Sequence, residues 1–293
     1  MLSLGILTTA CHDDTPIPVQ IQGTVVIESF DPDQYFIYPE GTTIEVLSAA
    51  GEFLGKTQTN RIGQYQLNIE GVNPGDELRV RASYADPKTK LTLSTAKRAQ
   101  VNKERIAYVP QLTFVYPEGS ELTRYQNSWH DESGNVQIED PDGRFSRVWA
   151  RAFDPEFDRP FFPGDYRDAD GIKIISNGFL FVSAQDASGK QVTSLVEPVT
   201  TYFYIPTTHR YYLRDVTPNN GLYEVPMYLY NEAQDTWVRR GTGVVVDAGY
   251  QPVPESDEEQ ITTDPNYGRL FVMFKADHFS IWNIDHQLPP CKQ

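Results

Sequence analysis

Apolar and polar residues alternate along most of the chain, in short stretches that end at Gly, Pro, Asp or Asn. A period of two is typical of β-strands with one buried face, and those four residue types mark the turns between strands. Residues 19–116 hold seven such stretches, which predict a β-sandwich. They are QIQGTVVI, TTIEVLSA, GEFLGKTQT, GQYQLNI, DELRVRASY, KLTLSTA and VPQLTFVY.

Strand signals resume at about Phe145 and continue to the C-terminal end. They are GIKIIS, GFLFVSAQD, EPVTTYFYIP, RYYLRDV, YEVPMYLYNE, DTWVRRGTGVVVDAG and GRLFVMFKADHFSIWNID. Residues 117–144 are polar and rich in turn residues, which is typical of a linker or a long loop. The pattern therefore predicts an all-β chain of two β-sandwich-like domains, at residues 19–116 and 145–293.

Two strands of the first expected domain carry a recognisable pattern. The opening strand has the form I-x-G-x-V-V around Gly23, and a later strand has the form G-x-Y-x-L with Tyr65 and Leu67. With the strand at residues 43–47 between them, this resembles the carboxypeptidase-regulatory-like, or transthyretin-like, β-sandwich module. The resemblance implies that Tyr65 and Leu67 face the core, and their period-two spacing agrees with this.

The last three strand stretches resemble a C-terminal β-module of bacterial surface proteins. Its strands have the forms V-P-x-Y-x-Y-[DN]-E and x-W-x-x-x-G, and a final strand ends in H-F-S-x-W-N-x-D. The resemblance implies a cell-surface setting and assigns no activity. The matching positions are Val225, Pro226, Tyr228, Tyr230, Asn231, Glu232, Trp237, Gly241, His278, Phe279, Ser280, Trp282, Asn283 and Asp285.

The segment MLSLGILTTAC joins an apolar run and small residues to Cys11. It resembles the end of a bacterial lipoprotein signal peptide, which implies a lipid on Cys11 and a membrane at the outer envelope or cell surface as a partner. Residues 1–18 are then a signal-like segment and a tether. A coincidental apolar start is the alternative, because no Lys or Arg precedes Cys11.

The sequence has 25 basic and 40 acidic side chains, a formal charge of −15. Surfaces that follow nucleic-acid backbones need clustered Lys and Arg, so we do not expect nucleic acid as a partner. Residues 19–116 hold 10 basic and 11 acidic residues, and residues 117–293 hold 15 and 27. A basic run is expected to form a strand face opposite the acidic part; it comprises Lys88, Lys90, Lys97, Arg98, Lys103 and Arg105.

One acidic tract, FDPEFDRPFFPGDYRDADGIKI, is a candidate for metal binding. Its acids are Asp154, Glu156, Asp158, Asp165, Asp168 and Asp170. The DADG sequence places two carboxylates two positions apart before a Gly, as calcium-binding loops do. The EF-hand spacing fails, because the leading acid and the bidentate Glu are both missing. Asp165, Asp168 and Asp170 are the candidate Ca²⁺ ligands, with a solvated acidic loop as the alternative.

His278 and Ser280 are the residues most suggestive of nucleophilic catalysis. Two positions apart on a strand, their side chains lie about 7 Å from each other, which is too far for direct proton transfer. No G-x-S-x-G elbow is present. We therefore expect His278 to hydrogen-bond a buried backbone group while Trp237 and Trp282 fill the core.

Aromatic residues are dense in the second expected domain, and in TYFYIP they alternate sides of a strand. Some of them therefore face outward unless another layer covers them. Tyr202, Tyr204 and Tyr211 are candidates for a face that stacks against sugars, and core filling is the alternative.

These observations together predict a non-catalytic bacterial envelope lipoprotein that acts by binding or structural contacts with a glycan or a protein partner. The first alternative is an envelope hydrolase with paired carboxylates, which requires acids with raised pKa values in a cleft. The second is an assembly subunit of a surface complex, which requires a large exposed apolar patch.

Overall fold

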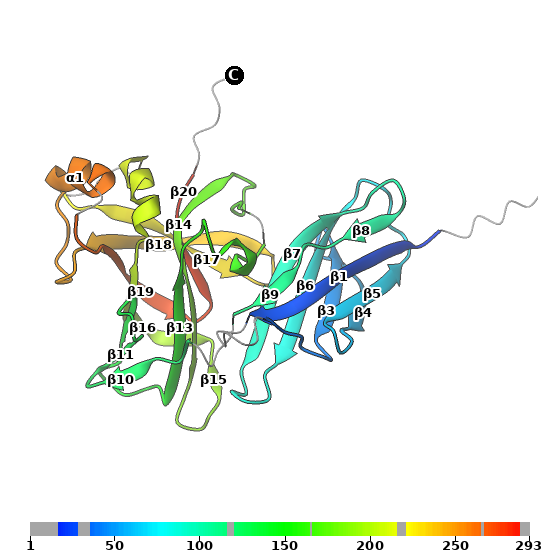
Figure 1. Cartoon of the computed structure of the whole chain (residues 1–293), viewed down its shortest axis with the longest axis horizontal. Coiled ribbons are helices and arrows are strands. Elements are labelled where there is room, and N and C mark those ends of the chain that lie inside the picture. Colours follow the sequence, from blue (N-terminus) through cyan, green and yellow to red (C-terminus); the bar gives the residue numbers. More distant parts are fainter. Residues whose placement is uncertain are drawn as a thin grey trace, which may run out of the picture.

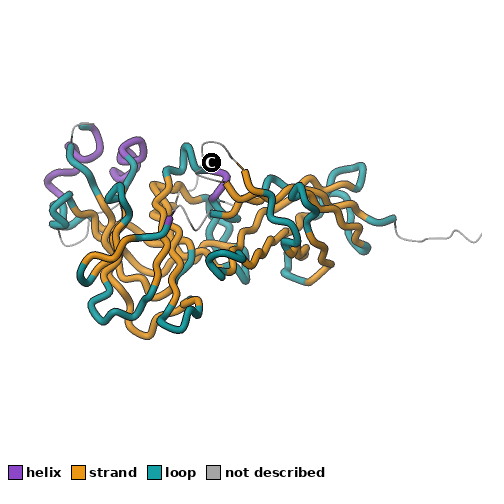
Figure 2. Tube along the Cα trace, turned by 60° about the horizontal axis from the view of Figure 1, so that its bottom comes forward, coloured by secondary structure: helices purple, strands orange, loops and turns teal. Residues whose placement is uncertain are grey.

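The computed structural model describes residues 17–28, 36–115, 120–164, 166–215, 221–264 and 267–287. Strands dominate these residues, so the chain is all-β, as predicted. Figures 1 and 2 show two groups of strands, which we call the N-terminal part (β1 to β9) and the C-terminal part (β10 to β20). Their independence as folding domains stays a prediction. None of the described helices has the length and apolarity needed to cross a membrane.

Two sheets form the N-terminal part. In the first sheet β1 is the central strand. It pairs antiparallel with β2 and β5 and parallel with β8 and β9. The second has the order β4-β3-β6-β7. All seven predicted strand stretches are confirmed here. The bounds are β1 (Val19–Glu28), β2 (Phe36–Ile37), β3 (Thr43–Ser48), β4 (Phe53–Gln58), β5 (Gln64–Ile69), β6 (Glu77–Ala85), β7 (Thr92–Gln100), β8 (Ile106–Tyr108) and β9 (Leu112–Phe114).

The core of the N-terminal part lies between its two sheets. Tyr65 and Ile69 are buried there and Leu67 packs against the same cluster, as the alternation predicts. Gly23 pairs with Tyr65 in the sheet, and a Cβ at Gly23 would lie 2.5 Å from the Tyr65 hydroxyl. Any larger residue at position 23 would therefore clash with the Tyr65 side chain.

One curled sheet of eleven strands forms the C-terminal part, rather than two separate stacked sheets. Its order is β10-β11-β12-β16-β19-β18-β17-β20-β14-β13, with β15 paired to β14. The strands are β10 (Thr123–Tyr125), β11 (Ser128–His130), β12 (Val136–Glu139), β13 (Arg147–Phe153), β14 (Ile174–Gln185), β15 (Gln191–Val192), β16 (Ser194–Tyr204), β17 (Glu224–Asn231), β18 (Thr236–Val246), β19 (Phe271–His278) and β20 (Ile281–Gln287).

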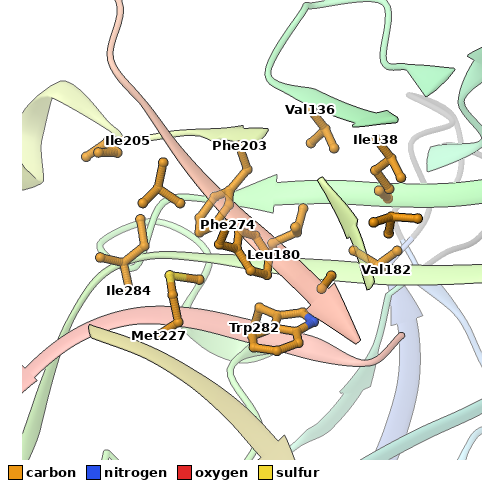
Figure 3. Close-up of a cluster of buried hydrophobic side chains, with 14 of the residues drawn as sticks. Val136, Ile138, Leu180, Val182, Phe203, Ile205, Met227, Phe274, Trp282 and Ile284 are labelled. Atoms are coloured by element: carbon orange, nitrogen blue, oxygen red, sulfur yellow. The ribbon is translucent and has the colours of Figure 1, made fainter. Parts of the chain in front are cut away.

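The inner face of the curled sheet holds the main apolar cluster of the C-terminal part (Figure 3). Trp282 of β20 packs against Phe274 of β19, with the rings tilted and their centroids 4.9 Å apart. Leu180 of β14 and Ile138 of β12 belong to the same cluster, although these strands lie far apart in the sheet order. The curl brings them together and lets a single sheet enclose a core.

Residues 117–144 differ from the linker or long loop that the sequence predicts. Within this range β10, β11 and β12 form one end of the curled sheet, and β12 pairs with β16. Only Trp129, Val136 and Ile138 are buried on these strands. Three apolar positions spread over three short strands give too weak an alternation to recognise in the sequence.

The sequence predicts a strand at RYYLRDV, but residues 210–215 of this stretch lie in the 3₁₀ helix η3 (Thr207–Asp215), and Val216 lies outside the described residues. Pro206 follows the end of β16 and cannot donate a hydrogen bond to continue the ladder. The buried side chains are Arg210 and Leu213, three positions apart, which matches the three-residue turn of a 3₁₀ helix. The other described helices are η2 (Arg159–Phe161), η4 (Glu255–Asp257) and α1 (Glu258–Thr263).

The two parts touch through an aromatic cluster on the outer face of the curled sheet. Phe162 packs on Trp237, Phe179 and Tyr166, and Ala96 of β7 belongs to the same buried cluster. The Gly164 N–H donates to the Ala96 carbonyl at 3.0 Å, and the Lys97 ammonium donates to the Phe162 carbonyl. The expected contact between the basic face and the acidic part therefore involves Lys97 of the basic run.

Candidate functional site

A cleft of about 680 Å³ lies between the two parts. Glu45 of β3, Arg81 of β6 and Ser94 of β7 line one wall, and Glu232 and Arg240 line the other. Charges of both signs therefore face the same space. Hydroxyl and amide side chains complete the polar walls, and they belong to Ser83, Thr92, Gln191, Thr193, Asn231 and Ser280.

Two of the sequence motifs end at this cleft. β17 brings Tyr230 and Asn231 to it, and the turn between β19 and β20 brings His278, Phe279 and Ser280. The Phe279 N–H donates to a backbone carbonyl just before β16 at 3.0 Å. The turn is therefore held in place by a neighbouring strand as well as by its own two.

His278 stands at the end of β19, beside the cleft. Burial lowers the pKa of His278, and its Nδ1 has no hydrogen-bond partner among the described residues. Nδ1 therefore does not make the hydrogen bond to a buried backbone group that is expected of His278, and that bond stays a prediction for Nε2. The His278 carbonyl accepts the indole N–H of Trp282 at 2.9 Å. Trp237 and Trp282 are both buried, so the prediction of core filling is confirmed.

Asn283 and Asp285, at the end of the final motif, form a buried polar network. Ser176 Oγ donates to Asn283 Oδ1 at 2.6 Å, and Asn283 Nδ2 donates to Asp285 Oδ2 at 2.5 Å. The other Asp285 oxygen has no hydrogen-bond partner among the described residues. Complete burial, and then the charge of Asp168, raise the pKa of Asp285 well above its ordinary value. We therefore expect Asp285 to be neutral at low pH and to resist ionisation.

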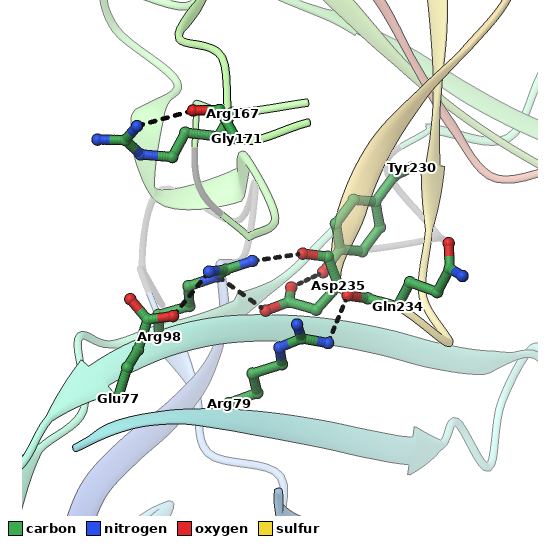
Figure 4. A network of polar contacts seen from close by, with 8 residues as sticks. All are labelled: Glu77, Arg79, Arg98, Arg167, Gly171, Tyr230, Gln234 and Asp235. Atoms are coloured by element: carbon green, nitrogen blue, oxygen red, sulfur yellow. Dashed lines mark hydrogen bonds and ion pairs between the residues drawn. The ribbon is translucent and has the colours of Figure 1, made fainter. Parts of the chain in front are cut away.

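A polar clamp holds the β17–β18 turn against the N-terminal part (Figure 4). The Arg79 guanidinium donates to the Gln234 carbonyl at 2.7 Å, and Arg98 donates to the Asp235 carbonyl at 3.2 Å. Arg98 also lies 3.5 Å from the Asp235 carboxylate, to which the Tyr230 hydroxyl donates. Burial raises the pKa of Asp235, and the Tyr230 bond and the nearby arginines lower it in part. Of the clamp residues, Tyr230 also lines the cleft.

The three candidate calcium ligands do not form a described cluster. Asp165 lies outside the described residues. Asp168 is buried, and its Oδ1 accepts the backbone N–H groups of Asp170 and Ile172 at 3.0 and 2.9 Å. Asp170 is exposed. Asp168 therefore closes a tight turn, and the calcium site remains a prediction.

A different group of candidate metal ligands comes together beside η3. Asp154, Glu156 and His209 offer ligand atoms within 4.8 Å of one another, and His209 Nε2 lies 3.0 Å from Asp154 Oδ1. A hollow of about 530 Å³ adjoins them, with Arg159 on its wall. Two carboxylates and an imidazole are ligands that a divalent cation accepts. The acidic tract predicted from the sequence includes Asp154 and Glu156, whereas His209 was missed because it is 55 positions from Asp154.

The three candidate tyrosines lie in different environments. Tyr202 is 7% exposed and its ring centroid lies 4.6 Å from that of Tyr250. Burial, and then Glu139, raise the pKa of Tyr202 to about 12. Tyr204 is partly buried and its hydroxyl lies 3.0 Å from Thr207 Oγ1. Tyr211 on η3 is 46% exposed, so the three do not present one continuous exposed platform.

Comparison with known proteins adds no relative. No protein-family model matches the chain, and a search of curated proteins also found no match. The resemblances of the two parts to known modules therefore stay predictions.

Proposed function

We propose that this chain is a non-catalytic binding protein of a bacterial cell envelope, held to the membrane through Cys11, with a polypeptide segment of a partner in the cleft between the two parts. The observation that carries the proposal is the composition of the cleft walls. They combine both charge signs, Arg240 opposite Glu45 among them, with hydroxyls, amides and the apolar Phe279.

A polypeptide suits such walls because its own side chains are charged, polar and apolar in turn. A strand placed between the parts can pair its charges with Arg240 and Glu232 while its backbone meets the hydroxyl groups. The cleft volume of about 680 Å³ is large enough for a few residues of a peptide. It also falls within the usual range for ligand sites in proteins. The clamp supports this use of the cleft because it fixes the β17–β18 turn, whose Glu232 and Ala233 line the cleft.

The rival function, an envelope hydrolase with paired carboxylates, is favoured by one observation. Asp158 Oδ2 accepts the Asp154 N–H at 2.9 Å, and burial raises the pKa of Asp158. A carboxyl with a raised pKa beside a second carboxyl is the arrangement that general acid–base catalysis uses. Arg151 lies 3.5 Å from Asp158, however, and an ion pair of this kind is also a common structural feature.

Photo-crosslinking in cells that produce the full chain tests the proposal. A photoreactive residue replaces Arg240 in the cleft, and a matched variant carries it at Glu259, which is exposed on α1. We expect a discrete, protease-sensitive adduct from position 240 and none from position 259. A protease-resistant, polydisperse adduct from position 240 would identify a glycan as the cleft ligand. No specific adduct from position 240, with membrane fractionation retained, would overturn the proposal for the cleft.

The hydrolase is tested separately with purified chain and a panel of chromogenic glycosides and esters. Turnover that Asp158→Asn removes, while Asp142→Asn leaves it unchanged, would replace the binding proposal with the hydrolase. Asp142 is an exposed acid in the C-terminal part and serves as the matched control.

A further inference from the structure

The outward face of the first sheet is covered with amide side chains. β1 and β5 pair antiparallel, and three consecutive outward pairs are Gln20 with Asn68, Gln22 with Gln66, and Thr24 with Gln64. The residues between them, such as Ile21 and Ile69, are buried in the core. Over the paired residues 19–24 and 64–69, strand alternation therefore places the apolar side chains inward and leaves an outward surface of amides and one hydroxyl.

Tyr108 of β8 stands beside these amides. β8 runs parallel to β1, and Tyr108 pairs with Gln22. The side chain is 62% exposed. A ring with this exposure contributes little buried apolar area to the stability of the fold. Among hydrogen-bonding groups it offers a flat apolar surface to a ligand.

A groove of about 630 Å³ runs over this surface. Thr57 and Gln58 of β4, Asn60 and Gln111 extend it beyond the first sheet. None of the described residues that line it is charged. Charged residues make up 22% of the chain, so an uncharged groove of this size stands apart from the rest of the surface. We call this groove, with Tyr108, the amide face.

The chemistry of the amide face selects its ligand. Each amide carries two donors and an acceptor, which matches hydroxyl groups that both donate and accept. The contacts among the amides themselves are long, 3.3 Å from Gln20 Nε2 to Gln22 Oε1, so water or a ligand competes well with them. A charged polymer of either sign finds no counter-charge here, because none of the described residues that line the groove is charged. The ligand that fits is an uncharged polymer of hydroxyl groups with a flat ring.

We infer that the amide face binds a neutral polysaccharide, with Tyr108 stacked on a sugar ring and Gln22 and Gln66 bonded to its hydroxyls. This site is separate from the cleft, which is lined from the N-terminal part by β3, β6 and β7 of the other sheet. The inference therefore does not depend on the proposed partner of the cleft.

Affinity electrophoresis of the full chain in gels that contain one polysaccharide at a time tests the inference. The neutral probes are a β-glucan, a mannan, a xylan and a galactan, and the acidic probes are alginate and polygalacturonate. We expect retardation by at least one neutral polymer and none by the acidic ones. Tyr108→Ala should weaken the retardation at least tenfold, and so should the double variant Gln22→Ala with Gln66→Ala.

Tyr125→Ala is the matched control, because Tyr125 of β10 is 66% exposed on the other part of the chain. It should leave retardation unchanged. Gln66→Glu adds one charge at an exposed position and should also abolish binding without affecting the melting temperature. Lack of retardation by all four neutral polymers would overturn the inference. Equal retardation of wild type and Tyr108→Ala would overturn it too, as would a preference for the acidic polymers.

Discussion

Single buried acids give this chain its most direct pH dependence, and Asp285 is the clearest case. Its carboxyl is completely buried, and its raised pKa means that the folded state holds the proton more tightly than the unfolded state does. The stabilisation by that proton is complete below the unfolded pKa, near 4, and is lost as the pH rises through the folded pKa. Above the unfolded pKa the folded chain must either keep this proton or bury a charge, and both alternatives cost stability.

We predict that Asp285→Asn stabilises the protein at pH 8 by about 1 to 3 kcal/mol and has little effect at pH 4. The amide keeps an acceptor for Asn283 Nδ2 and removes the ionisable group. Urea unfolding of both proteins from pH 4 to pH 8 measures the difference. Asp170→Asn, at an exposed carboxylate, should show no such trend. A variant that is less stable than wild type at pH 8 would show that Asp285 is needed as an anion.

The calcium prediction can be tested at Asp168, where the observed role in a backbone turn is separable from the predicted role as a ligand. Its Oδ1 closes a backbone turn, and an Asn at this position keeps that acceptor while it loses the charge. We predict that millimolar Ca²⁺ raises the melting temperature of wild type by a few degrees and does not raise that of Asp168→Asn.

Asp247→Asn is the control for this experiment, because Asp247 Oδ1 closes a similar turn by accepting the N–H groups of Gly249 and Gln251. It should keep the calcium response. Identical melting temperatures of wild type with and without Ca²⁺ would remove the calcium site, and the tract would then be a solvated acidic loop.

At the scale of elements, alternation predicted seven of the nine described N-terminal strands, where apolar residues alternate between turn signals, and it missed the short strands β2 and β8. β5 is an example, with Tyr65 and Ile69 buried and Gln64, Gln66 and Asn68 exposed. The prediction failed where apolar residues are few, at β10 to β12, and where the spacing is three, at η3. The cluster of Asp154 and His209 could not be predicted, because the curl of the sheet creates it.

The β17–β18 turn offers a test of how the elements of the two parts are joined. Asp235 is fully buried, and Arg98 lies closest to its carboxylate. We predict that Arg98→Ala destabilises the chain by about 3 kcal/mol in urea unfolding, because it leaves a buried acid without its cation. Arg147→Ala removes an exposed pair with Glu121 and should cost less than about 1 kcal/mol.

A second substitution separates charge from packing in the clamp. Asp235→Asn in the Arg98→Ala background removes the stranded charge and keeps an acceptor for the Tyr230 hydroxyl. It should restore more than half of the lost stability. If the double variant is no more stable than Arg98→Ala, the arginine contributes through its backbone contacts and its packing.

At the scale of the whole molecule, the start of β1 and the cleft lie at different ends of the N-terminal part (Figure 1). Eight peptide units separate Cys11 from Val19, which spans at most roughly 26 Å when extended. A lipid on Cys11 would therefore hold the free end of the N-terminal part near the bilayer, with the C-terminal part directed away from it. Such an arrangement leaves the cleft open to partners.

We predict that Cys11→Ser moves the chain from the membrane fraction to the soluble fraction when the full coding region is expressed. Cys11 lies outside the described part of the structure. The expectation therefore depends on the sequence pattern and on the free energy of burying acyl chains in a membrane. Each buried methylene of a lipid contributes about 0.8 kcal/mol, so two acyl chains give stable anchoring that no described helix supplies. Cys291→Ser is the matched control, because it removes the only other thiol and should leave the fractionation unchanged. Release of both variants, or retention of Cys11→Ser after a high-salt wash, would contradict lipidation at Cys11.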